Sequence, residues 1–163
     1  MTEVAAAPDI RELTLADEAA TVRLARAVAA LARPGDVIAL AGELGVGKTR
    51  FARAFIDRLA GDGEEVPSPT FTLAQTYETP AATVWHFDLY RLSGPAETRE
   101  LGLEEAFAEG IALIEWPDRL GPLLPAERLD VALAFVADGG ARRARLTGHG
   151  GWARRLAGLR VDG

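Results

Sequence analysis

Residues 37–49 read VIALAGELGVGKT, in which a short apolar run passes into glycines and ends on Gly-Lys-Thr. A continuous apolar run of this length is typical of a strand that is buried on both faces of a sheet. The next residues, from Lys48 to Leu59, place Phe51, Phe55 and Leu59 four residues apart and predict an amphipathic helix. A buried strand that a glycine loop joins to such a helix favours an α/β fold with parallel strands at its centre.

The glycine loop fits the pattern G-x-x-x-x-G-K-[ST] at every fixed position, from Gly42 to Thr49. The glycines let successive backbone N–H groups curl around a phosphate, and the N-terminus of the following helix adds partial positive charge. The Lys48 ammonium would reach the β- and γ-phosphates, and the Thr49 hydroxyl would ligate Mg²⁺. The sequence therefore predicts a P-loop, with ATP and Mg²⁺ as the expected ligands.

Two acidic residues stand at the ends of further predicted strands, where open α/β sheets place their ligand crevice. Asp88 follows the apolar part of TVWHFDLYRL, and Glu115 ends the apolar run IALIE. Each is a candidate to bind the metal or to position water, although either could simply cap a loop. His86 lies two residues before Asp88, and we interpret it as a packed, hydrogen-bonded histidine rather than a catalytic base. Trp116 could stack on the base of the nucleotide or could belong to the core.

Alternating apolar patterns and turn residues predict the other elements. They are a strand over 10–15, a helix from its N-cap Asp17 to about Leu31, strands over 70–78 and 83–92, helical pieces over 94–110 interrupted at Gly102, a strand over 111–116, two strands over 128–148 joined at 138–140, and a helix over 152–159. Together they predict one α/β P-loop domain over residues 1–163. We expect a mostly parallel central sheet, antiparallel edge strands and helices on both faces, with flexible residues 1–9.

Composition narrows the class of protein. The chain has no cysteine, so disulfides and thiolate chemistry are excluded. No apolar stretch approaches a membrane span, and the N-terminus lacks a secretory pattern, so a soluble cytoplasmic protein is expected. The net charge is −6, but residues 139–163 carry six arginines and one aspartate. This basic hairpin and helix could contact RNA or an acidic partner, although a solvated face is the simpler interpretation.

The P-loop alone does not identify an acceptor for the phosphoryl group. The sequence has no asparagine, so it lacks the Asn-Lys-x-Asp motif that reads guanine in small GTPases. Arg91 and Arg99 could serve the lid of a small-metabolite kinase, but no separate run is long enough to form a lid domain. Three classes therefore stay open, namely an ATPase, a metabolite kinase and a nucleotide-sensing module without hydrolysis.

Five blocks in order narrow the choice: GELGVGKT, SPTFTL, HFDLYRL, ELGLEEAF and LIEWPDRL. In sequence and spacing they resemble the TsaE (YjeE) family, from about residue 10 to residue 137. The resemblance implies a bacterial ATPase that is required for the N6-threonylcarbamoyladenosine (t6A) modification of tRNAs that read codons beginning with A. It also implies slow ATP hydrolysis by the chain alone and action with TsaD and TsaB, which carry out the transfer to tRNA. A weak or indirect tRNA contact by the basic segment stays open.

The resemblance also assigns roles to residues. Asp88 and Lys48 would be catalytic, with Asp88 as the Walker-B-like acid, and Thr49 with Glu115 would ligate Mg²⁺. The residues expected to contact the nucleotide are Glu18, Glu43, Leu44, Gly45, Val46, Gly47, Lys48, Thr49, Trp116 and Asp118. Glu18 is expected near the adenine, together with Asp17 and Thr21. Ser68, Pro69 and Thr70 match a switch-like segment near the γ-phosphate.

Overall fold

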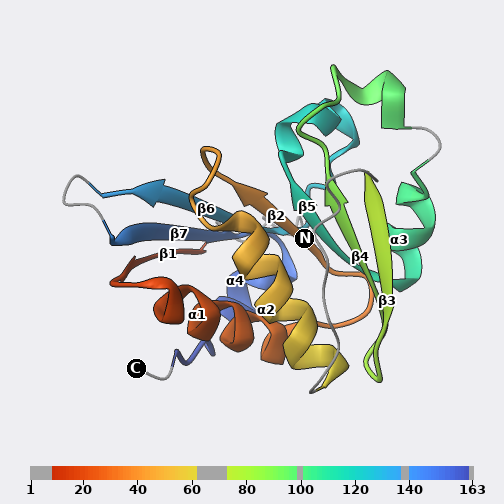
Figure 1. Cartoon of the computed structure of the whole chain (residues 1–163). Helices are drawn as coiled ribbons and strands as arrows, with labels where there is room; N and C mark the ends of the chain where they lie inside the picture. Colours follow the sequence, from red (N-terminus) through yellow and green to blue (C-terminus); the bar gives the residue numbers. More distant parts are fainter. Residues whose placement is uncertain (1–8, 62–72, 99–100, 137–139, 162–163) are drawn as a thin grey trace, which may run out of the picture.

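A mixed sheet forms the centre of the molecule, with its strands in the order β1-β7-β6-β2-β5-β4-β3 (Figure 1). The computed structural model describes residues 9–61, 73–98, 101–136 and 140–161. The strands are β1 (Asp9–Leu15), β2 (Val37–Ala41), β3 (Ala74–Glu78), β4 (Thr83–Asp88), β5 (Ile111–Glu115), β6 (Leu129–Phe135) and β7 (Arg142–Gly148). The helices are α1 (Glu18–Leu31), α2 (Lys48–Ala60), α3 (Leu103–Glu109) and α4 (Gly151–Leu156), with 3₁₀ segments η1 (Pro95–Thr98) and η2 (Pro117–Leu123).

Parallel pairing is confined to the middle of the sheet. Strand β2 pairs in parallel with β6 on one side and β5 on the other, and β5 pairs in parallel with β4. The pairs β3–β4, β6–β7 and β1–β7 are antiparallel. The predicted fold class, a parallel centre with antiparallel edges, is confirmed.

Helical elements cover both faces of this sheet. On one face, α1 and α2 pack side by side with α4 behind them, and their apolar residues share one core with Ile38 and Leu40 of β2 (Figure 1). On the other face, α3 and η2 pack against Ala112 and Ile114 of β5 in a second core. Because successive residues of a strand point to opposite faces, the fully buried run of β5 serves both cores.

Local signals set the helix ends. The Asp17 side chain accepts a hydrogen bond from the backbone N–H of Ala20 at 2.8 Å and caps α1, as its position before the helix predicts. The buried stripe of α1 includes Leu24, Ala25, Val28 and Ala29. Val22 is only partly buried, whereas Leu24 is fully buried.

Most other predicted elements occur within a few residues of their expected bounds. The predicted strand over 83–92 ends at Asp88, and the helix expected over 152–159 spans Gly151–Leu156. Asp9, which we expected to be flexible, is the first residue of β1. Residues 1–8, 70–72 and 137–139 lie outside the described residues, and so does most of the predicted link over 138–140. None of the helices in the described part of the chain has the length and apolar character that a membrane span requires.

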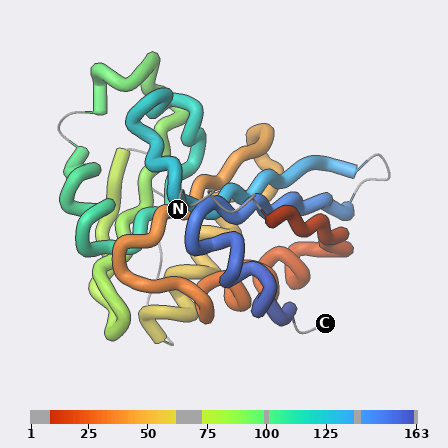
Figure 2. The backbone as a smooth tube through the Cα atoms, turned by 180° about the vertical axis from the view of Figure 1, so that it is seen from behind, coloured from red at the N-terminus to blue at the C-terminus, as the bar shows by residue number. Residues whose placement is uncertain are grey.

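The basic C-terminal segment is largely built into the fold. Seen from behind, α4 lies beside β1 (Figure 2). Arg155 makes two hydrogen bonds of 2.6 Å to the carboxylate of Asp36, and Arg145 lies 3.9 Å from Glu12. Arg142 donates to the backbone oxygen of Val46 at 3.1 Å. At least three of its six arginines therefore contact the protein itself.

Candidate functional site

The predicted P-loop connects the C-terminal end of β2 to α2. Gly47 is the N-cap of α2 and has no side chain to cap the helix, which leaves the N–H groups of its first turn available to an anion. Gly42, Gly45 and Gly47 all have positive φ angles, of 144°, 78° and 122°. A side chain at Gly42 would lie 2.5 Å from the carbonyl oxygen of Leu133 on β6. The glycines thus permit a backbone conformation and a close approach that other residues would oppose.

Glu115 brings three elements together. It ends β5, which borders the strand that carries the loop. The Thr49 hydroxyl, from the start of α2, donates to its carboxylate, with distances of 3.0 and 3.1 Å to the two oxygens. His86 Nε2, from β4, lies 2.7 Å from Glu115 Oε2. The carboxylate is only 2% exposed, so the structure places a buried acid directly beside the hydroxyl predicted to bind Mg²⁺.

Asp88 lies at the same edge of the sheet, one strand farther from the loop. It is paired in register with Glu115 on the neighbouring parallel strand. Its carboxylate accepts a hydrogen bond from the backbone N–H of Tyr90 at 3.2 Å. Burial raises the pKa of the Asp88 carboxyl, and the charge of Glu115 acts in the same direction. Asp88 therefore faces the site as an acid that holds its proton more readily than an exposed aspartate.

Lys48 lies between the loop and an aromatic ring. Its Nζ donates to the carbonyl oxygen of Gly42 and stands 3.6 Å from the centre of the Trp116 ring. Burial lowers the pKa of the Lys48 ammonium, while the charges of Glu115, Asp88 and Asp118 oppose this effect. The ring of Trp116 therefore faces the ammonium that the sequence predicts to bind phosphate.

Trp116 has an unusual backbone. Its φ is 62°, the only positive value among the non-glycine residues that the structure describes. A left-handed conformation is costly for a bulky side chain, and such residues cluster at ligand sites. Here it turns the chain out of β5 into η2 and leaves the ring near Lys48 and 5.0 Å from that of Tyr90.

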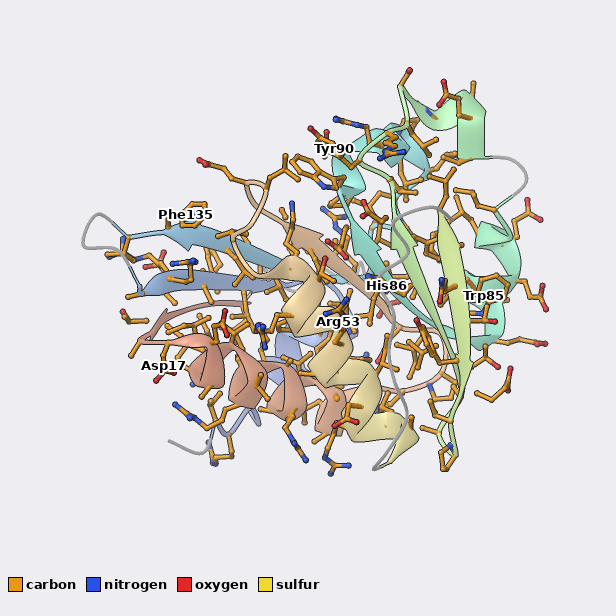
Figure 3. All side chains as sticks on the ribbon, viewed as in Figure 1. Asp17, Arg53, Trp85, His86, Tyr90 and Phe135 are labelled. Atoms are coloured by element: carbon orange, nitrogen blue, oxygen red, sulfur yellow. The ribbon has the colours of Figure 1, made fainter. Side chains whose placement is uncertain are left out.

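A pocket of about 220 Å³ lies between the P-loop and the ends of β4 and β5. It is lined by Leu44, Gly45, Gly47, Lys48, Thr49, Arg50, Asp88, Tyr90, Glu115 and Trp116. The structure thus brings together Lys48, Thr49, Asp88, Glu115 and Trp116 from three parts of the chain. Tyr90 stands over this edge of the sheet (Figure 3). We did not single out Tyr90 from the sequence, although it lies in the block that contains Asp88.

The remaining predicted site residues surround this pocket at different distances. Glu43 and Leu44 are exposed on the loop, while Val46 is buried. Glu18 lies 3.4 Å from Arg50 and lines a hollow of about 50 Å³ with Asp17 and Thr21, next to the loop residues Gly45–Gly47. Asp118 is paired with Arg119 at 2.7 Å and does not line the 220 Å³ pocket as described. The predicted switch residues Ser68, Pro69 and Thr70 lie outside the described residues.

A larger cavity, of about 790 Å³, lies away from the loop between η1, α3 and η2. Its described lining is mainly apolar, and the charged side chains there are Glu104 and Glu105. The described lining of the larger cavity has no cation to offset its two carboxylates, whereas the smaller pocket combines Asp88 and Glu115 with a lysine, an arginine and a helix N-terminus. The smaller pocket is therefore the better candidate for the predicted phosphate site.

The donor set of that pocket fits Mg²⁺ with a nucleotide. Magnesium prefers oxygen ligands and is usually bound by one or two protein groups together with phosphates and water. The Thr49 hydroxyl and the Glu115 carboxylate, in mutual hydrogen-bond contact beside Lys48, supply such groups. The close packing at Gly42 and the uncapped start of α2 fit a phosphate held by backbone N–H groups.

Comparisons with known proteins agree with these features. The family model described as Threonylcarbamoyl adenosine biosynthesis protein TsaE matches residues 15–144. A protein of Rickettsia bellii named tRNA threonylcarbamoyladenosine biosynthesis protein TsaE is 45% identical over 124 residues, which cover 76% of this chain and 86% of that protein. A protein of the same name from Bacillus subtilis is 40% identical over 119 residues, which cover 72% and 73% of the two chains.

The fold has a solved counterpart as well. The crystal structure of Bacillus subtilis YdiB superposes with a TM-score of 0.78 and 29% sequence identity, covering 94% of this chain and 95% of the other. The family match spans β2, the loop and the strand-end acids that build the site. On this evidence the chain belongs to the TsaE family, which takes part in tRNA threonylcarbamoyladenosine biosynthesis.

Proposed function

We propose that this chain binds ATP with Mg²⁺ and hydrolyses it as a component of the tRNA t6A-modifying machinery, in which it acts with TsaD and TsaB. The contact between the Thr49 hydroxyl and the buried Glu115 carboxylate, inside a P-loop pocket, is the observation that carries the nucleotide part. Membership of the TsaE family carries the pathway part.

Each side chain has a role that its position supports. The Lys48 ammonium and the N–H groups at the start of α2 bind the phosphates and stabilise negative charge that develops on them. Thr49 and Glu115 hold Mg²⁺, which supplies further charge neutralisation when bound. Asp88 lines the same pocket, and its raised pKa suits it to accept a proton from an attacking water.

We infer that partners control the rate. Control by partners suits an ATPase whose output is a conformational change. Slow hydrolysis by the chain alone follows if water is aligned with Asp88 only in the complex.

Labelled ATP tests this proposal. The chain, Mg²⁺ and γ-labelled ATP are incubated with and without a purified TsaB–TsaD pair and with a pool of small metabolites. We expect free labelled phosphate, released faster when TsaB–TsaD is present, and no release by Lys48→Ala or Thr49→Ala. A labelled metabolite would instead identify a kinase. Equal turnover with and without the pair would argue against control by partners, and no turnover under any condition would overturn the ATPase proposal.

A further inference from the structure

His86 is a fully buried polar residue in direct contact with the candidate metal ligand. Its side chain is 0% exposed and projects from β4 (Figure 3). Its Nε2 atom lies 2.7 Å from Oε2 of Glu115, within hydrogen-bond range. The other ring nitrogen, Nδ1, is buried and has no hydrogen-bond partner in the part of the chain that the structure describes.

These contacts determine which ring nitrogen carries the proton. A carboxylate oxygen is an acceptor, so Nε2 must donate if the 2.7 Å contact is a hydrogen bond. A proton on Nδ1 would add a buried donor without an acceptor, which costs free energy. The contacts therefore favour the tautomer with its proton on Nε2.

The Nε2–H donor of His86 constrains Glu115. It holds one carboxylate oxygen in place, and the negative charge of the carboxylate stays available to a cation. The Thr49 hydroxyl, at the start of α2, contacts the same carboxylate. Glutamate has three rotatable side-chain bonds, so without such contacts its oxygens could occupy several positions. Magnesium requires nearly ideal octahedral geometry, which makes the orientation of a ligand important.

We propose that His86 is a positioning residue, which orients the Glu115 carboxylate for Mg²⁺ through the Nε2–H hydrogen bond. The inference rests on the proposed function, since it assigns the metal to Glu115 and Thr49. Side chains that hydrogen-bond to a metal ligand commonly change metal affinity by about 10–100-fold when they are replaced. A residue that served packing alone would change the stability of the protein without changing its affinity for the metal.

Replacements of His86 that differ in side-chain length and in donor groups separate a positioning role from a packing role. The amide of Gln can place an N–H donor near the position of Nε2, whereas Asn is one methylene shorter and Leu has no donor. Val84→Ala is the matched packing control, because Val84 is fully buried two residues away on the same strand and does not line the pocket. For each variant, ADP affinity is measured by calorimetry over a range of Mg²⁺ concentrations, and Mn²⁺ binding to the ADP complex by electron paramagnetic resonance.

We expect the half-saturating Mg²⁺ concentration to rise about 10-fold or more in His86→Leu and His86→Asn. His86→Gln should stay within about threefold of the wild type, and metal-free ADP affinity should change little in all three, because the phosphate-binding loop is untouched. Val84→Ala should lower the melting temperature and keep the metal dependence of the wild type. If His86→Leu does not fold, the comparison of Gln with Asn decides the question.

The tautomer gives a readout that is independent of metal and activity. The chain has only two histidines, His86 and His149, so imidazole ¹⁵N resonances can be assigned by comparison with His149→Gln. The proton of His86 is expected on Nε2. A proton on Nδ1, or wild-type metal affinity in folded His86→Leu or His86→Asn, would overturn the positioning role. Loss of metal affinity in Val84→Ala equal to that in His86→Leu would overturn it too. If the ADP affinity of the wild type does not depend on Mg²⁺, the proposed function is overturned, and this inference with it.

Discussion

Individual glycines of the P-loop differ in why they cannot be replaced. Gly42 and Gly45 both have positive φ, which side chains oppose. A Cβ on Gly42 would also stand 2.5 Å from the Leu133 carbonyl oxygen and 2.8 Å from a methyl group of Val46. A Cβ on Gly45 would meet nothing within 4 Å. Gly42 is therefore constrained by conformation and by space, and Gly45 by conformation alone.

This difference predicts unequal losses of stability. Gly45→Ala should lower the free energy of unfolding by about 1 kcal/mol, because alanine opposes the left-handed conformation. Gly42→Ala should lower it by about 3 kcal/mol, because steric overlap with the backbone is added. Urea unfolding of the nucleotide-free protein measures both. Equal losses at the two positions would show that the approach of β6 to the loop does not limit residue 42.

Asp88 should affect stability in a pH-dependent way. Burial raises the pKa of its carboxyl above 3.8, and an acid with a raised folded-state pKa stabilises the fold only while it is protonated. This contribution is present at low pH and is lost as the pH rises through the folded-state pKa. Asp88→Asn should therefore increase the free energy of unfolding at pH 7, and the gain should shrink as the pH falls toward about 4. Urea titrations between pH 4 and 8 test this, and a gain that does not vary with pH would contradict the role of burial.

At the level of residues, the sequence was sufficient for groups that belong to one continuous motif. Lys48 and Thr49 follow from the loop pattern because a strand, a loop and a helix fix their positions locally. The arrangement of Asp88 and Glu115 did not follow, since it depends on the order of the strands, in which β5 lies between β2 and β4. His86 was interpreted correctly as buried and hydrogen-bonded, but its partner is 29 residues away on another strand.

Single side chains also attach whole elements, as the contact between α4 and the turn before β2 shows. Arg155 donates twice to the Asp36 carboxylate, at 2.6 Å, and once to the Leu31 carbonyl oxygen at 3.0 Å. The two charged side chains are 15% and 9% exposed. Removal of one member of a buried pair leaves the other charge without a partner, which is commonly more costly than the loss of the pair.

Arg155→Ala should therefore destabilise the protein by about 3–5 kcal/mol. Arg155→Lys should lose less but should not restore the wild type, because an ammonium cannot make the paired contacts of a guanidinium. Removal of both charges, as in Asp36→Asn with Arg155→Met, should be milder than Arg155→Ala alone. Chemical unfolding of the wild type, these variants and the single variants Asp36→Asn and Arg155→Met measures this, and a loss in the double variant equal to the sum of the two single losses would show that the two residues are not coupled.

At the level of elements, the ranges of the helices and strands could largely be predicted, but the sheet order could not. Apolar periodicity is local and predicted β2, α2 and β5 well. In the pairing of β1 with β7, Asp9 lies opposite Gly148, and residues so far apart in the sequence share no local pattern that predicts their pairing. For the same reason, the sequence left open whether the basic segment meets RNA or water, and it did not show that Arg142, Arg145 and Arg155 contact the protein itself.

On the scale of the whole molecule, nucleotide binding should be visible as a change in thermal stability. A ligand present at 100 times its dissociation constant stabilises the folded state by about 2.7 kcal/mol. For a protein of this size, ADP with Mg²⁺ at that level should raise the melting temperature by about 5–10 °C. Differential scanning fluorimetry measures the shift, which Lys48→Ala should abolish at the same concentrations. A shift that persists in Lys48→Ala would place the nucleotide outside the P-loop pocket.

The position of β1 at the edge of the sheet has a consequence for synthesis of the chain on the ribosome. Its residues pair with Arg142–Gly148 of β7, which the ribosome makes long after β1. At 5–20 residues per second, the ribosome needs on the order of 10 s to reach β7 after β1 has been made. The P-loop, α2, β4 and β5 are synthesised within that interval. The nascent chain therefore holds the parts of its predicted nucleotide site before β1 has a partner, and the sheet is completed only after β7 has been made.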